Sequence, residues 1–561
     1  MQELVRQYLT RSWDAEKAER IQFSAVPKGQ FGDLALSFFE LAKTENVSPV
    51  QIAQEVQKIL TGSNFVEETK GVGPYLNISF DLNTFFVQVL NTPLYTEFSK
   101  GKTIVLEFSG PNTNKPLHLG HMRNHALGIA VANLLGQSGA TVHRVNIIND
   151  RGVHICKSML AYQRWGQDET PEKTGEKPDH FVGRYYVKFE QEAKKDESLK
   201  NEIQNMLVQW ESGDPKVREL WEKMSHWALT GHEKTYARQG VEFEKEYRES
   251  EHYQSGVEAV QEGFKKGVFQ KREDGTLFID LSEEGLDEKV VLRADGTAIY
   301  LTQDIGLAKL RYDEFHPDEM IYVVADEQNY HFQVLFLCLE KLGLLDKKHL
   351  HHLGYGLVNL PHGRMKSREG TVVDADNLMD DLSNLALTEI KKRNPDLSQN
   401  EAQKIAEQIM NAAWKFYLLT TNPRKTITFN PEQSIAFEGA TGPYLQYAGV
   451  RMKSIFKKAG SSLESNKESV GFLEKAEKPL GRKILEFPDV LDRSAEQKNP
   501  TYLVTYLLEL AQTWSSYYSE HSILKAETDD LKKARLALAH KVYNVLEAGL
   551  GILGIEIPEV M

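Results

Sequence analysis

The segment 103–121 constrains the fold more than any other stretch, because it joins a buried strand to a helix that opens with two histidines three residues apart. Ile104 to Phe108 is apolar and β-branched at its start, and Glu107 is its only charged residue, which is typical of a central strand in a parallel sheet. Ser109, Gly110, Pro111 and Asn112 then break the strand. The segment therefore predicts a buried strand whose carboxyl end opens onto a turn.

A helix and a second strand are expected to follow. Thr113 or Asn114 is the expected helix cap, Pro116 suits the first turn, and apolar residues keep a helical spacing down to Gly136. Residues 142–148 then predict a second strand, which completes a strand–helix–strand unit with a right-handed crossover. We therefore expect an α/β domain around this segment.

Two histidines three residues apart carry the chemistry of this corner. On a first helical turn, His118 and His121 share a face where the helix dipole and free amides favour an anion, so a polyphosphate can dock there. Gly120 lets a flat base or ribose approach the backbone, and Lys115 adds a positive charge. A metal pair or two ordinary surface histidines are the alternatives, but no further zinc ligands stand close by in the sequence.

Pro116-Leu-His-Leu-Gly-His121 after a strand resembles the first signature of class I aminoacyl-tRNA synthetases. The longer run Glu107-Phe-Ser-Gly-Pro-Asn-Thr-Asn-Lys-Pro-Leu-His-Leu-Gly-His121 is similar to the version found in arginyl-tRNA synthetases. The resemblance extends along the whole chain. It implies a Rossmann-like parallel-sheet catalytic domain with a helical insertion, an N-terminal α+β domain and a C-terminal all-α anticodon-binding bundle.

Composition sets the outer limits of this interpretation. A chain of 561 residues is too long for a single core, and its two cysteines, Cys156 and Cys338, allow neither a disulfide framework nor a thiolate zinc site. The chain shows no signal core and no long uncharged run, so we expect a cytoplasmic protein without a membrane span. A net charge of -13 argues against a generally basic nucleic-acid binder but leaves room for local basic faces.

Residues 1–98 predict a small α+β domain, with helical patterns at 3–9, 33–43 and 49–60 and an extended piece at 73–80. Gly32-Asp-Leu-Ala35 and the extended piece resemble the amino-terminal module of arginyl-tRNA synthetases, which contacts the outer corner of the tRNA. The resemblance implies that Tyr75 stacks on a D-loop nucleotide and that Asn77 hydrogen-bonds it. The alternative is a structural hairpin with a half-buried tyrosine.

The catalytic domain is predicted over 99–375, and its sheet pattern is interrupted by a charged helical insertion at about 162–289. After it, Asp295-Gly296 predicts a turn, 298–302 a short strand, and Asp304 the start of a helix. A carboxylate at the end of a sheet strand faces the crevice where such sheets bind ligands. Asp304 and Glu107 are therefore predicted to accept the paired N–H donors of a guanidinium substrate, with Tyr300 beside them; a plain helix cap is the alternative for Asp304.

A further strand is expected at 320–325, followed by a turn and a helix. Gln328 and His331 match positions that arginyl-tRNA synthetases use near the substrate. The resemblance implies that Gln328 and Asn112 bind the α-amino group and that His331 orients its neighbours. Ordinary turn and capping chemistry is the alternative for Gln328 and His331.

The strand expected at 349–358 leads into Gly363-Arg-Met-Lys-Ser-Arg-Glu-Gly370. Class I synthetases usually have Lys-Met-Ser-Lys-Ser here, and this chain departs from that pattern around Met365. The resemblance implies that Lys115 compensates for the altered loop. We predict Lys115 first, and then Lys366 and Arg368, as the cations that steady the leaving phosphates.

Residues 376–561 predict a helix bundle, with helical periodicity at 381–392, 401–419, 445–458, 502–518 and 531–550 and a polar, loosely ordered segment at 460–499. The segment 437–451 and the tail 535–561 resemble the anticodon-binding domain of arginyl and related synthetases. Tyr444 and Tyr447, three apart on one helical face, either stack on anticodon-loop bases or belong to the core.

The sequence thus predicts an arginine–tRNA ligase that uses ATP with Mg²⁺ to form arginyl-adenylate and then esterifies tRNA(Arg), acting as a monomer without a structural metal. His118, Gly120, His121, Met365 and Lys366 are the expected ATP-binding residues. Three rival functions remain: a class I synthetase for another amino acid, a small nucleotidyltransferase, and a catalytically silent tRNA-binding relative.

Overall fold

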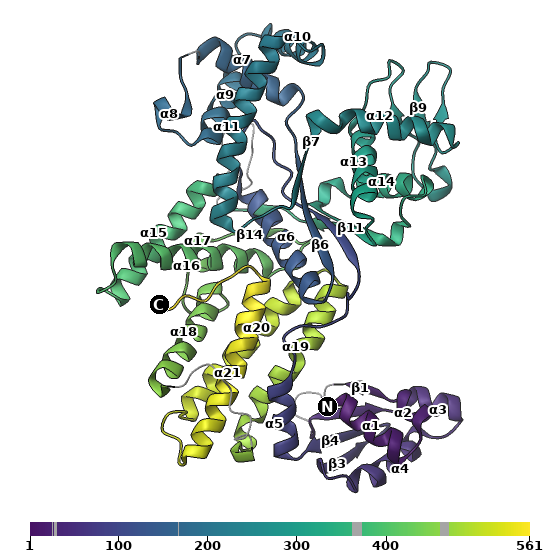
Figure 1. Cartoon of the computed structure of the whole chain (residues 1–561), viewed down its shortest axis with the longest axis vertical. Helices are drawn as coiled ribbons and strands as arrows, with labels where there is room; N and C mark the ends of the chain where they lie inside the picture. Colours follow the sequence, from purple (N-terminus) through teal and green to yellow (C-terminus); the bar gives the residue numbers. More distant parts are fainter. Residues whose placement is uncertain (25, 27–30, 167, 362–372, 461–470) are drawn as a thin grey trace. The chain divides into compact units, whose positions relative to one another are not determined.

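The structure is a computed structural model that describes residues 1–24, 26, 31–166, 168–361, 373–460 and 471–561. The chain divides into two compact units (Figure 1). The first unit comprises Met1–Leu94, Ala448–Val490 and Tyr506–Ala548, and the second comprises Tyr95–Tyr447, Leu491–Thr505 and Gly549–Met561. The predicted bundle 376–561 is therefore shared between the two units, although the sequence indicated one separate domain.

The first unit contains an antiparallel sheet in the order β1-β2-β4-β3. Its strands are β1 Gln22–Ser24, β2 Leu34–Ser37, β3 Val66–Val72 and β4 Tyr75–Phe80. Its amino-terminal helices are α1 Gln2–Ser12, α2 Ala15–Glu19, α3 Phe39–Glu45, α4 Pro49–Thr61 and α5 Leu82–Asn91. The helix expected at 33–43 is wrong in its first half, because buried Leu34 and Leu36 pair with β4 as a strand.

Four long helices follow in the carboxyl-terminal part of the chain, and each has residues in both units. They are α18 Gly442–Ala459, α19 Lys478–Glu496, α20 Thr501–Glu520 and α21 Asp529–Ile552. The expectation of a loosely ordered segment at 460–499 is wrong over α19. Leu480, Ile484 and Phe487 recur at helical spacing and are fully buried, whereas the prediction weighed only the lysines and glutamates around them.

A five-stranded parallel sheet forms the centre of the second unit, in the order β12-β11-β5-β6-β7. The strands are β5 Thr103–Glu107, β6 Thr141–Ile148, β7 Lys245–Arg248, β11 Glu319–Ala325 and β12 Leu350–Tyr355. β5 pairs with β6 on one side and with β11 on the other, so the strand order reverses beside β5. Open α/β sheets bind ligands at such a switch point, outside the carboxyl ends of the strands.

The predicted insertion at 162–289 contributes to this sheet, which the sequence did not indicate. β7 lies inside that range and pairs with β6 as an edge strand. Its sequence is Lys-Glu-Tyr-Arg, and only Tyr247 is buried, so it lacks the apolar run of a central strand. A short edge strand needs no such run.

The second unit also contains many helices, some next to the sheet and others in a separate helical group (Figure 1). They are α6 Leu119–Gln137, α7 Val153–Trp165, α8 Pro171–Thr174, α9 Pro178–Glu192, α10 Leu199–Glu211, α11 Pro215–Gln239, α12 Glu249–Lys265, α13 Tyr300–Phe315, α14 Asn329–Lys341, α15 Ala375–Arg393, α16 Gln399–Leu419 and α17 Pro431–Ser434. Small sheets are formed by β8 Gln270–Lys271, β9 Leu277–Ile279 and β10 Lys289–Leu292, and by β13 Val358–Asn359 and β14 Ile427–Thr428. Within the described part of the chain, no helix is both long and apolar enough to cross a membrane.

The strand expected at 298–302 is wrong, because α13 begins at Tyr300. Only a single bridge between Leu292 and Ala298 remains of the predicted pairing. The side chain of Thr302 accepts the amide N–H of Ile299 at 2.9 Å, which starts the helix earlier than its sequence pattern suggests. Asp304 consequently lies in the second turn of α13 and is neither at a strand end nor a helix cap.

Candidate active site

The corner between β5 and α6 follows directly from local geometry. Ser109 and Gly110 both have positive φ, 82° and 64°, so the chain turns sharply as it leaves the strand. α6 begins only at Leu119 with His118 as its cap, so the expected caps Thr113 and Asn114 and the expected first-turn Pro116 precede the helix. The side-chain amide of Asn114 instead donates to the carbonyl of His154 at 3.2 Å.

The two histidines cap the helix together. The N–H of Gly120 donates to Nδ1 of His118 at 3.1 Å, and the N–H of His118 donates to Nδ1 of His121 at 3.1 Å. The ring centroids are 4.0 Å apart. A Cβ atom on Gly120 would come within 2.9 Å of the His118 ring, so glycine is required between them. Because both Nδ1 atoms accept, each ring has its Nε2–H left to donate outward.

Both rings are neutral. Burial, together with the charges of Lys115 and His125, lowers the pKa of His118 to about 3. Burial also lowers the pKa of His121 well below its usual value, with His118 the next cause. The pair is therefore a set of neutral N–H donors at a helix N-terminus.

Lys115 supplies the positive charge that the histidines lack. Burial lowers the pKa of its ammonium group. Among the described residues no carboxylate lies within ion-pairing distance of it. An incompletely solvated cation beside a helix N-terminus favours a bound anion, such as a phosphate group.

Glu107, at the carboxyl end of β5, already has an ionic partner inside the protein. Its carboxylate pairs with the guanidinium of Arg311, whose side chain is 1% exposed. Nε and Nη2 of Arg311 have no further partner in the described structure. The acid predicted for an incoming guanidinium is therefore already bound to an internal one.

Asp304 and Tyr300 lie four apart on α13, and Arg311 follows Asp304 at seven residues on the same face. Nε2 of His331 is 2.5 Å from Oδ2 of Asp304. Burial raises the pKa of Tyr322 above its usual value, and the charges of Glu107 and Asp304 add to this effect, against the opposing charge of Arg311. This shared influence places Glu107 and Asp304 in one electrostatic environment.

Tyr300, Gln328 and Asn112 present polar groups without a partner among the described residues. Tyr300 is 78% exposed, and Gln328 is exposed at the N-cap of α14. Asn112 is half-buried beside Asn149, with which its backbone forms a parallel bridge. These groups are available to a ligand.

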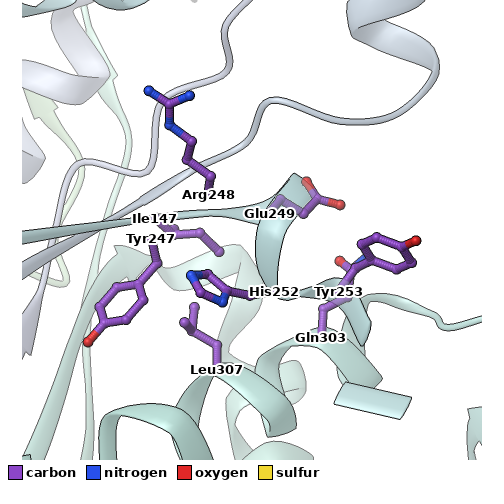
Figure 2. A pocket seen from close by; sticks show the side chains of 8 residues that line it. All are labelled: Ile147, Tyr247, Arg248, Glu249, His252, Tyr253, Gln303 and Leu307. Carbon is purple, nitrogen blue, oxygen red and sulfur yellow. The ribbon is translucent and has the colours of Figure 1, made fainter. Parts of the chain in front are cut away.

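A small cavity next to Asp304 contains an acid that the sequence did not single out (Figure 2). Burial, with the charges of Asp150 and Asp304, raises the pKa of Glu249 to about 7, against the opposing effects of Arg151 and Gln303. Glu249 begins α12 within the predicted insertion, where a charged helix indicates only a solvated face. Only the three-dimensional contacts distinguish it from its neighbours.

Comparison with known proteins identifies the family. A family model for "tRNA synthetases class I (R), catalytic domain" matches residues 87–430, one for "DALR anticodon binding domain" matches 445–561, and one for "Arginyl tRNA synthetase N terminal domain" matches 1–80. The chain is 41% identical to an arginine–tRNA ligase of Bacteroides fragilis strain YCH46, over 97% of this chain and 96% of that one. The chain belongs to the arginyl-tRNA synthetase family.

Other members of the arginyl-tRNA synthetase family support the assignment. The arginine–tRNA ligase of Treponema denticola is 43% identical over 97% of this chain and 95% of its own length. The solved Thermus thermophilus arginyl-tRNA synthetase superposes with a TM-score of 0.82 at 26% identity, covering 100% of this chain and 99% of that one. The similarity thus covers both the catalytic fold and the terminal regions.

The residues expected to contact tRNA in an arginyl-tRNA synthetase differ in their surroundings. Tyr75 is 38% exposed and packs edge-on against the exposed Phe39, with ring centroids 5.7 Å apart. Asn77 is 2% exposed and donates its amide to the carbonyl of Phe31 at 2.9 Å, so its burial argues against a nucleotide contact. Tyr444 and Tyr447 are half-buried in the first turns of α18. Met365, Lys366 and Arg368 of the second family signature lie outside the described residues.

Proposed function

We propose that the chain ligates L-arginine to tRNA(Arg) at the corner formed by Lys115, His118 and His121. ATP and arginine form arginyl-adenylate with release of pyrophosphate, and the arginyl group then passes to the 3′-terminal adenosine of the tRNA. The observation that carries this proposal is the buried ammonium of Lys115, which has no acid partner among the described residues and lies beside two neutral histidines at a helix N-terminus.

The nucleotide side works by positioning and charge. The Nε2–H groups of His118 and His121 donate to phosphate oxygens, and Lys115 offsets charge that develops on the leaving pyrophosphate. Because both histidines remain neutral, they donate hydrogen bonds without exchanging protons during the reaction. Gly120 keeps the space beside the His118 ring open.

We place Mg²⁺ on the phosphate oxygens of ATP, since this ion keeps much of its water shell and usually takes few protein ligands. Asp179, His180 and Asp376 bring three potential ligand atoms within 4.8 Å of one another. However, the ammonium of Lys177 lies 2.8 Å from both of those aspartates and already supplies the positive charge between them. We therefore assign no metal to that group.

The arginine side selects a guanidinium through the acid Asp304 on α13. Asp304, held by His331, accepts paired N–H donors, and the exposed Tyr300 closes over the aliphatic stem. Gln328 and Asn112 bind the α-amino group. Glu107 contributes to the electrostatic potential of the pocket through its ion pair with Arg311.

We further propose that Tyr75, Tyr444 and Tyr447 stack on tRNA bases, and that the enzyme acts as a monomer in the cytoplasm. The exposed ring of Tyr75 supports the first contact. Cys156 and Cys338 are both buried and unpaired, which fits a reducing compartment. Sedimentation at several concentrations tests the monomer.

An ATP–pyrophosphate exchange assay with each amino acid, with and without total tRNA, tests the function. We expect exchange with arginine alone among the amino acids. Exchange with another amino acid would overturn the substrate assignment. No exchange under any condition, with tRNA still bound, would favour a catalytically silent relative.

A further inference from the structure

Two helices of the insertion contact the segment that leads into the histidine pair. A Cβ atom on Gly183 of α9 would come within 2.7 Å of Cδ of Pro116, so only glycine permits this packing. Nε2 of His232 on α11 lies 2.9 Å from the carbonyl oxygen of Lys115 and donates to it. Lys115 and Pro116, just before His118, are therefore both contacted by helices of the insertion.

A second strand-like contact holds the same segment from the start of α15. The N–H of Leu119 donates to the carbonyl of Val373 at 3.0 Å, and the N–H of Ala375 donates to the carbonyl of Leu117 at 3.0 Å. His118 and Asp374 thus face each other in an antiparallel bridge. The backbone position of His118 depends on the position of Asp374.

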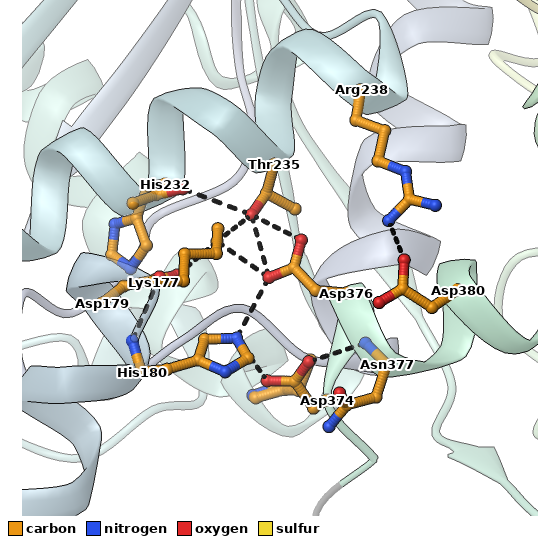
Figure 3. A network of polar contacts seen from close by, with 12 residues as sticks. Lys177, Asp179, His180, His232, Thr235, Arg238, Asp374, Asp376, Asn377 and Asp380 are labelled. Atoms are coloured by element: carbon orange, nitrogen blue, oxygen red, sulfur yellow. Dashed lines mark hydrogen bonds and ion pairs between the residues drawn. The ribbon is translucent and has the colours of Figure 1, made fainter. Parts of the chain in front are cut away.

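A polar network joins α9 and α11 to this start of α15 (Figure 3). The ammonium of Lys177 lies 2.8 Å from carboxylate oxygens of both Asp179 and Asp376. It also donates to the hydroxyl of Thr235 on α11 at 2.7 Å. Lys177 therefore links Asp179 and Thr235 of the insertion to Asp376 of α15.

His180 is the second cationic position in the network. Its Nε2 lies 3.2 Å from Oδ2 of Asp374 and 3.2 Å from Oδ2 of Asp376. Asp374 also caps α15, since it accepts the N–H of Asn377 at 2.9 Å. His180 is thus the side chain of the insertion that reaches Asp374, the residue opposite His118.

The charges around His180 favour its protonated form. Burial lowers its pKa, but the hydrogen bond to Asp376 and the charges of Asp374 and Asp179 outweigh burial and raise it, against the opposing charge of Lys177. Three carboxylates thus share one lysine and one histidine. The nearby Arg238 and Asp380 already neutralise each other at 2.6 Å.

We propose that His180 is a positioning residue for adenylate formation, which holds Asp374 and, through the backbone bridge, the first-signature histidine His118. This inference rests on the proposed function. It assigns to the insertion a part in the chemical step, apart from any contact with tRNA. Neither His180 nor Asp374 is proposed to contact ATP.

The sign of the pH dependence follows from the direction of the shift. A histidine whose folded pKa is raised contributes fully while it is protonated and loses its contribution as pH rises through the folded pKa. The exchange rate with arginine should therefore fall on the alkaline side as His180 loses its proton. The other titratable groups that face it are Asp179, Asp374, Asp376 and Lys177. Hydrogen bonds from His180 and Lys177 lower the pKa of Asp376 to about 2, against the opposing effect of burial.

The test uses the full chain in the arginine-dependent exchange assay, at pH values from the usual histidine pKa of about 6.5 upward. His180→Gln should lower kcat by about 10- to 100-fold, the scale of a small misplacement of reacting groups, and should lose the alkaline decline. His180→Lys should keep activity where the wild type has fallen, because lysine stays charged. Asp374→Asn keeps the helix cap but removes the charge, and it should resemble His180→Gln.

His226→Gln, on the exposed face of α11, is the matched control and should behave as the wild type. If His180→Gln keeps the wild-type kcat or the same alkaline decline, the inference is overturned. If His180→Gln does not fold, a decline in His180→Lys parallel to that of the wild type overturns it equally, and retained activity supports it. Absence of arginine-dependent exchange in the wild type would instead overturn the proposed function.

Discussion

The proposed nucleotide side and the proposed arginine side of the site are built in opposite ways. The ring of His118 accepts the N–H of Gly120, and the ring of His121 accepts the N–H of His118. Both rings are neutral, and their centroids are 4.0 Å apart. Around Asp304, by contrast, acids gather, Tyr300 and Gln328 are exposed, and an internal guanidinium already holds Glu107. The first side is thus held together by its own hydrogen bonds, whereas the second leaves polar groups exposed.

Because of this difference, we expect loss of a charge to change kcat on one side and the KM for arginine on the other. On the nucleotide side, the cation Lys115 matters as charge develops in the transition state, so its loss should lower kcat. On the proposed arginine side, Asp304 binds a group that does not react, so its loss should raise the KM for arginine.

The largest effect is expected for Lys115→Met, which keeps the length of the side chain but removes the ammonium. We predict that kcat for exchange falls by about 10²- to 10³-fold, because one preorganised electrostatic contact to the transition state is lost. Steady-state exchange kinetics measure it, with the exposed Lys200→Met as the control. A change confined to the KM for ATP would mean that Lys115 only binds the ground state.

Asp304→Asn should have the next largest effect. We predict a rise of about 10- to 100-fold in the KM for arginine with a smaller change in kcat, because a charge-assisted pair to the guanidinium is replaced by a neutral contact. Asp313→Asn on the exposed part of the same helix is the control. An unchanged KM would remove Asp304 from the arginine pocket.

Glu107→Gln distinguishes a structural acid from a binding one. Because Arg311 would be left buried without its counter-charge, we predict a loss of about 3 kcal/mol of stability, partly recovered in Glu107→Gln/Arg311→Met. Thermal unfolding monitored by circular dichroism measures it. A higher KM for arginine at unchanged stability would instead make Glu107 a direct ligand.

Glu249→Gln should have the smallest effect, and it depends on pH. An acid whose pKa is raised by burial to about 7 opposes folding where it is ionised, so stability falls as pH rises from its unfolded pKa through 7. We predict that Glu249→Gln raises the melting temperature more at about pH 8 than at about pH 5, because the destabilisation builds up as pH rises from the unfolded pKa through 7.

The exposed Glu258→Gln on the same helix is the control for this pH dependence. Equal shifts for Glu249→Gln at both pH values would show that Glu249 is already ionised and solvated in the folded protein.

The sequence predicted the parts of the fold that are coded locally. The strand that ends at Glu107, the helix down to Gln137 and the strand that ends at Ile148 all follow from apolar spacing, and the comparisons confirm the family that the histidine signature indicated. β7 was missed because a short edge strand with one buried tyrosine has no distinctive spacing. α19 was missed because composition was weighed before periodicity.

The site was predicted less completely, for a related reason. His118 and His121 can be recognised by their spacing in the sequence, but the hydrogen bonds by which they cap the helix cannot. The pairing of Glu107 with Arg311 joins residues 204 positions apart, and the cavity of Glu249 gathers residues from β6, β7, α12 and α13. No local pattern encodes such contacts.

The central claim is that the Lys115–His121 corner holds the phosphate while Asp304 selects the guanidinium in the same crevice. A crystal structure of the full chain with a non-hydrolysable arginyl-adenylate analogue tests it most directly. We predict the phosphate mimic within hydrogen-bonding distance of Nε2 of His118 or His121, and the guanidinium against Asp304. A guanidinium bound elsewhere, with Asp304 still held only by His331, would contradict the account.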